Sequence, residues 1–340
     1  TLQAAPDFEN PTDSDTNNVY NVTVQASDGN GGTTTQNIAV TVTAVNDNNP
    51  AFTSSTTFSL AENSAAVGTV TATDADSPAQ TVTFSLTGGA DQSKFSITSG
   101  GVLTFQAAPD FETPTDAGTN NVYNVQVTAS DGNGRATTQD IAVTVTPVND
   151  NNPFFTSATT ANVAENSMAV LTVTATDSDL PIQSLSFSLV GGADQAKFSI
   201  TSGGVLTFQA APDFENPTDN GANNVYNVTV QASDGNGGTT TQNIAVTVTA
   251  LNDNNPSFTS AATFNVAENS TAISTVSATD ADSPAQSVTF SLSGGADQSK
   301  FSITSGGVLT FNAVHDFENP NDVGTNNVYN VQVTANDNNG

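Results

Sequence analysis

A period of 103 residues runs through the whole chain and limits its fold more than any single motif does. The tripeptide Asp-Phe-Glu recurs at this spacing, beginning at Asp7, Asp110, Asp213 and Asp316. The pentapeptide Asn-Asp-Asn-Asn-Pro keeps the same register, beginning at Asn46, Asn149 and Asn252. Because about 100 residues is a common size for one domain, the sequence predicts a tandem array of similar domains.

Both ends of the chain fall inside a period. Residues 1–3 correspond to residues 104–106, so the first segment is expected to be the second half of a unit. The last segment stops before the counterpart of residues 137–146, so it is expected to lack one strand of a longer protein. The predicted domains are repeat 1 (1–48, the C-terminal part of a unit), repeat 2 (49–151), repeat 3 (152–254) and repeat 4 (255–340, without its last strand).

Apolar and polar residues alternate through each unit, which is the period of half-buried β-strands. In repeat 2 the alternation joins Tyr123, Val125, Val127 and Ala129; Ile141, Val143 and Val145; Val82, Phe84 and Leu86; Phe95 and Ile97; Leu103 and Phe105; Phe58 and Leu60; and Val70 and Ala72. No ten-residue stretch carries a helical apolar stripe. About seven short strands in this length predict an all-β fold of tandem seven-stranded Greek-key β-sandwich repeats, similar to immunoglobulin domains.

The charge of the chain excludes two classes of partner. Four basic residues against 33 acidic ones give a net charge of −29, whereas nucleic acids and anionic membranes attract clustered Lys and Arg. Such a charge is also typical of disordered chains, but the strict apolar patterning argues against disorder here. There is no cysteine, so a bound metal is the candidate for stiffening these domains.

The acidic residues of each unit stand at fixed positions, mostly at the ends of predicted strands. Turn formation accounts for Asp131 in Asp-Gly-Asn-Gly, but not for Glu62 or for the pair Asp74 and Asp76. Two carboxylates one residue apart repel each other unless a cation lies between them. Carboxylates, Asn side chains and carbonyl oxygens are the ligands that Ca²⁺ prefers, so the pattern favours a calcium site.

These motifs resemble, in order and spacing, those of the cadherin repeat. The family pattern x-E-N, D-x-D, D-R-E, A-x-D and D-x-N-D-N is matched in repeat 2 by Ala61-Glu62-Asn63, Asp74-Ala75-Asp76, Asp110-Phe111-Glu112, Ala129-Ser130-Asp131 and Val148-Asn149-Asp150-Asn151. The resemblance covers every unit and implies the cadherin form of the β-sandwich. One position departs from it: Ala44, Pro147 and Ala250 stand where the family has an Asp two residues before Asn-Asp-Asn.

The resemblance also implies that up to three Ca²⁺ ions bind at each junction between consecutive repeats. The first junction would use Asp7, Glu9, Asn46, Asp47, Asn48, Asp74, Asp76 and Asp131. The central junction would use Glu62, Asp110, Glu112, Asn149, Asp150, Asn151, Asp177, Asp179 and Asp234. The third junction would use Glu165, Asp213, Glu215, Asn252, Asp253, Asn254, Asp280, Asp282 and Asp337, while Asp28, Glu268, Asp316 and Glu318 belong to incomplete sites.

The charge count agrees with this set, because the junctions and incomplete sites take 24 of the 33 acidic residues. A junction of seven carboxylates with three Ca²⁺ keeps a charge of about −1, whereas without metal its carboxylates repel one another. We therefore expect calcium to convert a flexible string of domains into a rod. The loop at residues 113–121 of repeat 2 is expected at the surface, and an extra cation bound by Asp13, Asp116, Asp219 and Asp322 is an alternative left open.

An enzyme is not expected, because a catalytic site would be one distinct place, whereas these carboxylates recur in each unit. The predicted function is a calcium-stiffened extracellular rod or stalk that supports cell adhesion, in a secreted or surface-bound protein, expected to be bacterial. Two alternatives remain: self-association of the repeats into a filament or homophilic contact, and calcium-dependent carbohydrate binding. The absence of Trp and the core-like phase of the four Tyr count against the latter. The predicted partners are calcium, the chain itself or a cell surface, with no nucleic acid and no membrane insertion.

Overall fold

The computed structural model describes residues 2–338 and separates the chain into two compact units. The first unit comprises Thr1–Asn151 together with Ser178–Gln183, and the second comprises Asn152–Asp177 together with Ser184–Gly340. Almost all of the regular structure is β-strand, as the alternation predicts. Within residues 2–338, no helical segment has the length and apolarity needed to cross a membrane.

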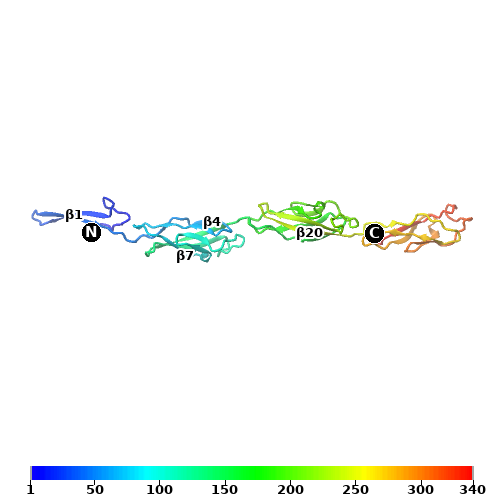
Figure 1. Cartoon of the computed structure of the whole chain (residues 1–340), viewed down its shortest axis with the longest axis horizontal. Helices are drawn as coiled ribbons and strands as arrows, with labels where there is room; N and C mark the ends of the chain where they lie inside the picture. The colour runs from blue at the N-terminus through cyan, green and yellow to red at the C-terminus, as the bar shows by residue number, and fades with distance from the viewer. Residues whose placement is uncertain (1, 339–340) are drawn as a thin grey trace. The chain divides into compact units, whose positions relative to one another are not determined.

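The first unit contains repeat 1 and repeat 2. Repeat 1 contributes an antiparallel pair, β1 (Val19–Ser27) and β2 (Thr33–Thr41). Repeat 2 contains β3 (Ala51–Phe52), β4 (Thr57–Ala61), β5 (Ala66–Thr69), β6 (Ala72–Thr73), β7 (Thr83–Gly88), the 3-10 turn η1 (Gln92–Lys94), β8 (Phe95–Ile97), β9 (Val102–Phe105), β10 (Val122–Ser130) and β11 (Ala136–Thr146). A four-stranded sheet β4-β11-β10-β7 and a three-stranded sheet β5-β9-β8 form the sandwich (Figure 1).

The core of repeat 2 lies between these two sheets, where the alternation places it. Tyr123 is 1% exposed and its ring meets Phe105 edge-on at a centroid distance of 5.0 Å. Phe105 in turn stacks on Phe95 at 4.5 Å. Val125 and Val127 of β10 lie below this aromatic group and are almost fully buried. The predicted alternation of β10 is therefore confirmed, since a strand that faces a core on one side buries every second side chain.

The seven predicted strands appear as nine segments, because two of them are interrupted. The first strand is divided into β3 and β4, and the second into β5 and β6. Val70, which was predicted to share a strand with Ala72, lies between β5 and β6, although it is fully buried. Its backbone N–H donates to the carbonyl of Gly101 over 2.8 Å instead of to a regular ladder, which breaks the strand there.

Gly101 is required at this break for a steric reason. Its φ is +87°, and a Cβ at this position would lie 2.1 Å from the carbonyl oxygen of Val70. Only glycine adopts this conformation without strain and permits so close an approach of two backbones. The same arrangement recurs at Gly204 and Gly307.

The second unit contains repeat 3 and repeat 4. Repeat 3 has the segments β12 (Phe154–Phe155), β13 (Thr160–Ala164), β14 (Ala169–Thr172), β15 (Ala175–Thr176), β16 (Ser186–Gly191), η2 (Gln195–Lys197), β17 (Phe198–Ile200), β18 (Val205–Phe208), β19 (Val225–Ser233) and β20 (Thr239–Thr249). Repeat 4 has β21 (Ser257–Phe258), β22 (Ala272–Thr275), β23 (Ala278–Thr279), β24 (Thr289–Gly294), η3 (Gln298–Lys300), β25 (Phe301–Ile303), β26 (Val308–Phe311) and β27 (Gln332–Asn336). The sheet β13-β20-β19-β16 of repeat 3 reproduces that of repeat 2, whereas in repeat 4 β24 pairs only with β27.

The loop before β10 lies at the surface as expected, but its aspartate is buried. Asp116 is 3% exposed, and its carboxylate accepts hydrogen bonds from the backbone N–H groups of Gly118, Asn120 and Asn121. Asp219 and Asp322 make the same contacts in repeats 3 and 4. These aspartates hold the loop in shape through its own backbone, which explains their recurrence without an extra cation.

Candidate metal centre

The first junction brings carboxylates of repeat 1, the linker and repeat 2 together. Glu9, Asp47 and Asp76 each place one carboxylate oxygen within 4.8 Å of the others. Asp76 also belongs to a second group of this size, with Asp74 and Asp131. One side chain is thus shared by two adjacent carboxylate groups, a layout in which neighbouring cations could share a ligand.

Several acceptor atoms of the first junction are buried without a hydrogen bond. They are Oδ2 of Asp74, Asp76 and Asp131 and Oδ1 of Asn46. Buried acceptors are normally satisfied, so this set points to a missing cationic or water partner. All four are oxygen atoms, and hard oxygen ligands of this kind fit Ca²⁺ better than Zn²⁺ or copper.

The linker holds Asp76 in its charged form. The Nδ2 of Asn48 donates to Oδ1 of Asp76 over 2.9 Å, and the backbone N–H of Asn48 donates to the same atom over 3.2 Å. The side-chain hydrogen bond from Asn48 is the largest cause that lowers the pKa of Asp76, outweighing the effect of burial. Since the amide nitrogen of Asn48 faces the carboxylate, the oxygen that Asn48 could give to a cation is its carbonyl.

The part of the central junction that lies in the first unit has a comparable arrangement. Glu62, Glu112 and Asp150 place carboxylate oxygens within 4.8 Å of one another. Glu62 is 4% exposed, and its two oxygens accept the backbone N–H groups of Phe111 and Val148 over 2.6 and 2.7 Å. Burial, followed by the nearby charge of Glu62, raises the pKa of Glu112, although the backbone N–H of Leu180 lowers it. Asn63 donates to Asp150, and Asn151 donates to Asp179 over 2.9 Å.

The second unit contains the whole third junction. Glu165, Asp213 and Glu215 place oxygens within 4.8 Å of one another. Burial, with the charges of Glu165 and Asp282, raises the pKa of Glu215, while Oε2 of Glu215 accepts no hydrogen bond. Asn254 donates to Asp282 over 2.9 Å, as Asn48 does to Asp76 in the first junction. Among the other predicted ligands, Asn252 donates to Asp337 over 2.6 Å, Asp253 is bonded to Asn166 and Asn254, and the N–H of Asp282 donates to Asp280.

Some predicted residues have other positions. Asp7, Asp110 and Asp213 are exposed, and each accepts backbone N–H groups of its own turn. Asn149 is bonded to Gln183 in the first unit, whereas Asp177 and Asp234 belong to the second. Outside the complete junctions, Asp28 accepts Asn30 and Gly32, and Glu268, Asp316 and Glu318 are exposed.

Two kinds of residue at or near the junctions escaped the sequence reasoning. Arg135 donates its Nε to the carbonyl of Asn46 over 3.4 Å and so brings a positive charge to the first junction. Asp91 is 3% exposed and accepts the backbone N–H groups of Ala117 and Asn124, as Asp194 and Asp297 do in later repeats. The signal was the recurrence of Gly-Gly-Ala-Asp in each repeat, which was not assigned a role.

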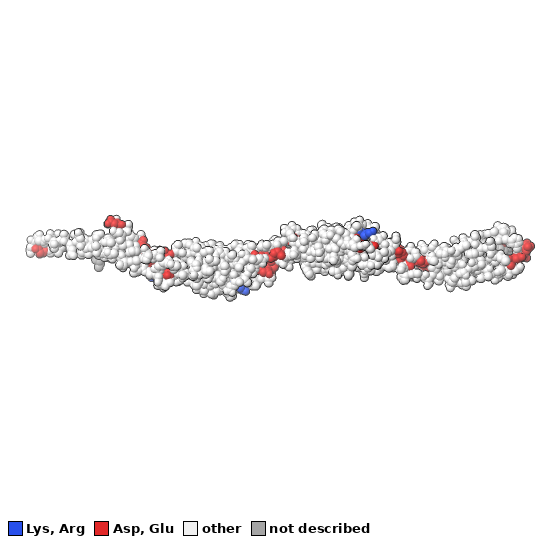
Figure 2. Space-filling model, in the orientation of Figure 1, with Lys and Arg blue, Asp and Glu red and all other residues white. Residues whose placement is uncertain are grey.

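The acidic side chains are unevenly distributed over each unit. On the face drawn in Figure 2, Asp and Glu gather in patches at the ends of repeats, and the flanks of the sandwiches are nearly free of charge. This distribution matches the junction clusters described above.

Comparison with known proteins places these features in a family. The cadherin domain profile matches residues 56–146, and the profile of a bacterial immunoglobulin-like domain matches residues 149–247. The human cadherin EGF LAG seven-pass G-type receptor 2 is 35% identical to this chain over 239 residues, and the human protocadherin Fat 1 is 32% identical over 317. The chain is a cadherin-repeat protein. These alignments cover 66% and 86% of the chain but only 8% and 7% of the relatives.

Solved cadherin structures agree with this assignment. Mouse cadherin-23 EC22-24 is 25% identical, with a TM-score of 0.60 over 80% of this chain and 90% of the other. The protocadherin GammaB4 extracellular domain is 27% identical, with a TM-score of 0.62 over 91% of this chain and 51% of the other. The predicted sandwich class is therefore confirmed, and the cadherin repeats identify an adhesion protein rather than an enzyme.

Proposed function

We propose that this chain is a calcium-stiffened extracellular segment that supports cell adhesion, with Ca²⁺ bound at the junctions between its cadherin repeats. The observation that carries the proposal is the shared carboxylate of Asp76. It belongs to two groups whose oxygens lie within 4.8 Å, and its own Oδ2 is buried without a hydrogen bond. A turn-forming aspartate would have no reason to keep such an atom.

The mechanism follows from the origin of the ligands. Glu9 comes from repeat 1, Asp47 from the linker, and Asp74 and Asp131 from repeat 2. Without metal these carboxylates repel one another, which favours opening of the joint. A cation held by all three segments reverses this effect and opposes bending, so calcium links the order of the linker to the order of both repeats. We place three Ca²⁺ in a junction with seven carboxylates.

The cellular role rests on the relatives. Cadherin repeats build the extracellular parts of adhesion proteins, and a chain with this charge would stay apart from anionic surfaces unless calcium bridges them. We therefore assign the segment to a secreted or surface-bound adhesin. The match of residues 149–247 to a bacterial immunoglobulin-like profile supports a bacterial origin.

Thermal unfolding with and without calcium tests the proposal on the full chain. Calcium should raise Tm strongly, and Glu215→Gln should remove part of the rise because it deletes one charge of the third junction. Asp140→Asn is the matched control, since Asp140 is exposed on β11 and Asn occupies the same position in repeats 1 and 3. Coincident melts in calcium and in chelator would refute the calcium site and leave only the β-sandwich array.

A further inference from the structure

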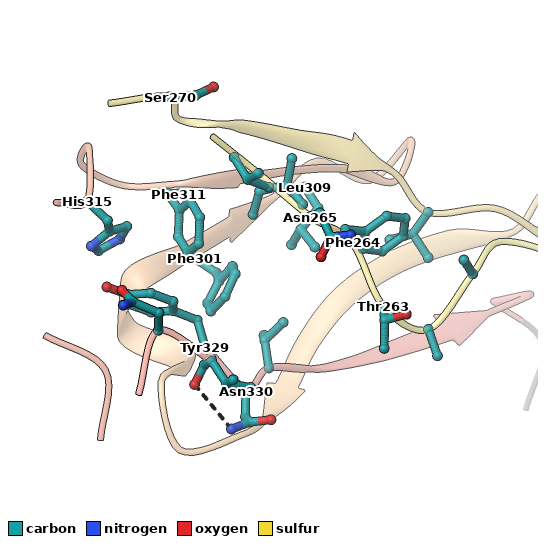
Figure 3. Close-up of a pocket in the computed structure, with 18 of the residues that line it drawn as sticks. Thr263, Phe264, Asn265, Ser270, Phe301, Leu309, Phe311, His315, Tyr329 and Asn330 are labelled. Atoms are coloured by element: carbon teal, nitrogen blue, oxygen red, sulfur yellow. Dashed lines mark hydrogen bonds between the residues drawn. The ribbon is translucent and has the colours of Figure 1, made fainter. Parts of the chain in front are cut away.

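Repeat 4 has an open groove where repeats 2 and 3 hold a strand. In repeat 3, β20 lies between β13, to which it is parallel, and β19, to which it is antiparallel. In repeat 4, residues 263–267 correspond to β13 but form no strand, and no residue between 2 and 338 takes the place of β20. A hollow of about 800 Å³ lies there instead (Figure 3).

The groove has an apolar lining that its counterparts bury. Tyr329, Val331 and Val333 line the hollow and are partly exposed, whereas Tyr226, Val228 and Val230 of repeat 3 are at most 1% exposed. Phe264 lies across the hollow from Tyr329, and Phe301 and Phe311 line its floor (Figure 3). The missing element is therefore a strand that presents apolar side chains to these residues.

Repeat 1 contains such a strand. Residues 33–43 are identical in sequence to residues 239–249, which include the whole of β20. Ile244 and Val246 of β20 are at most 1% exposed, but their counterparts Ile38 and Val40 in β2 are 39% and 43% exposed. The strand that closes the groove in repeat 3 thus has an exact sequence copy in repeat 1, with its apolar face uncovered.

The register of the groove suits β2. In repeat 3, Ile244 stands opposite Val228, and Val331 is the counterpart of Val228 in repeat 4. In repeat 1, Ile38 already stands opposite Val22 of β1 in the same antiparallel register. By exchanging β1 for residues 328–336, β2 would keep an antiparallel partner, gain residues 263–267 as a parallel partner, and bury its apolar face.

We propose that β2 of one copy of this chain inserts into the groove of repeat 4 of a second copy. The donor and acceptor surfaces are different, so the contact is heterologous and joins copies head to tail in an open series. The contact uses no junction carboxylate, so it is independent of the proposed calcium sites. A further segment with the sequence of residues 239–249 joined after residue 340 would fill the groove of its own chain and prevent the association.

Sedimentation of the 340-residue chain over a range of concentrations tests the proposal. We expect concentration-dependent, head-to-tail oligomers. Ile38→Asp should weaken the association by at least about a hundredfold, because a buried apolar side chain becomes a buried charge. Asn37→Asp adds the same charge on the opposite face and should leave the association unchanged, since Asp140 occupies this position in the closed repeat 2.

A second variant separates the groove from any other contact. The sequence of residues 238–249 appended after Gly340 should raise the Tm of repeat 4 and yield a monomer. The proposal is overturned if the unmodified chain stays monomeric at about 100 μM, if Ile38→Asp and Asn37→Asp behave alike, or if the extended chain still assembles. Calcium titration of the same samples reads out the junctions separately.

Discussion

Asn48 donates its side-chain amide to the carboxylate of Asp76 over 2.9 Å, which ties the linker of the first junction to the Asp-x-Asp motif of repeat 2. Asn254 and Asp282 repeat this contact at the same distance in the third junction. The bond fixes one oxygen of each aspartate and leaves Oδ2 buried and without a hydrogen bond. The linker therefore orients the carboxylate before any cation arrives, which reduces the ordering that binding has to supply.

Replacement of Asp76 by Asn should weaken calcium binding at the first junction at least about tenfold, because both carboxylate groups lose a shared charge. Calorimetric titration and native mass spectrometry of the full chain would give the affinity and number of ions. Asp140→Asn removes the same charge from an exposed position of β11 and should bind calcium as the unmodified chain does. Equal binding by both variants would contradict the role of Asp76.

Gly101→Ala should destabilise repeat 2 by about 2–4 kcal/mol, because the new Cβ would overlap the Val70 carbonyl at a φ of +87°. Denaturant unfolding would measure the loss. Gly100→Ala is the matched control, since a Cβ on Gly100 meets only the hydroxyl of Thr98, at 3.9 Å. Similar losses in the two variants would show that the backbone near Val70 yields easily.

Asp219→Ala should lower the free energy of unfolding of repeat 3 by about 1–3 kcal/mol, because several backbone N–H groups of its loop lose a charged acceptor. Asn220→Ala changes the adjacent residue to the one found in repeat 2, and should have little effect. The measurement is denaturant unfolding in chelator, which separates the loop from the junctions. An effect of calcium on the difference between the variants would point instead to a cation at Asp219.

The stability of the calcium-free chain should rise as the pH is lowered from 7 toward about 5. Burial raises the pKa of Glu112 and Glu215 above 4.5 in the folded state, so folding favours their protonated forms. Their contribution to stability is complete at pH 4.5 and is lost as the pH rises through the raised pKa. Asp76 and Asp219 have lowered pKa values, so below about 3.8 their protonation should destabilise the fold.

Melting curves of the chelated chain between pH 4 and 8 would show this trend. A variant with both Glu112→Gln and Glu215→Gln should lose most of the rise between pH 7 and 5, because Gln carries no titratable charge. Calcium affinity should fall over the same range, since protons compete with the cation for these carboxylates. An unchanged pH profile in the double variant would exclude the two glutamates as its cause.

Local patterns in the chain account for the sandwich class and the position of the core. The alternation around Tyr123 and Val125 requires one face of β10 to be buried, whatever packs on it, because successive side chains of a strand point to opposite sides. The order of the acidic motifs likewise identifies the residues of the metal clusters, since each motif recurs at the same point of the period. Such features depend on near neighbours in the chain, and so they can be read without a structure.

Only the tertiary structure decided how distant residues meet. It broke the strand at Val70, because Gly101 approaches from another part of the sandwich, and it made anchors of Asp91 and Asp116 by placing backbone N–H groups around them. It also showed that Oδ2 of Asp76 stays without a hydrogen bond while Oδ1 is bound by the linker. The sequence by itself determined which residues alternate and which carboxylates recur; packing decided their contacts, because burial and hydrogen bonding depend on segments far apart in the chain.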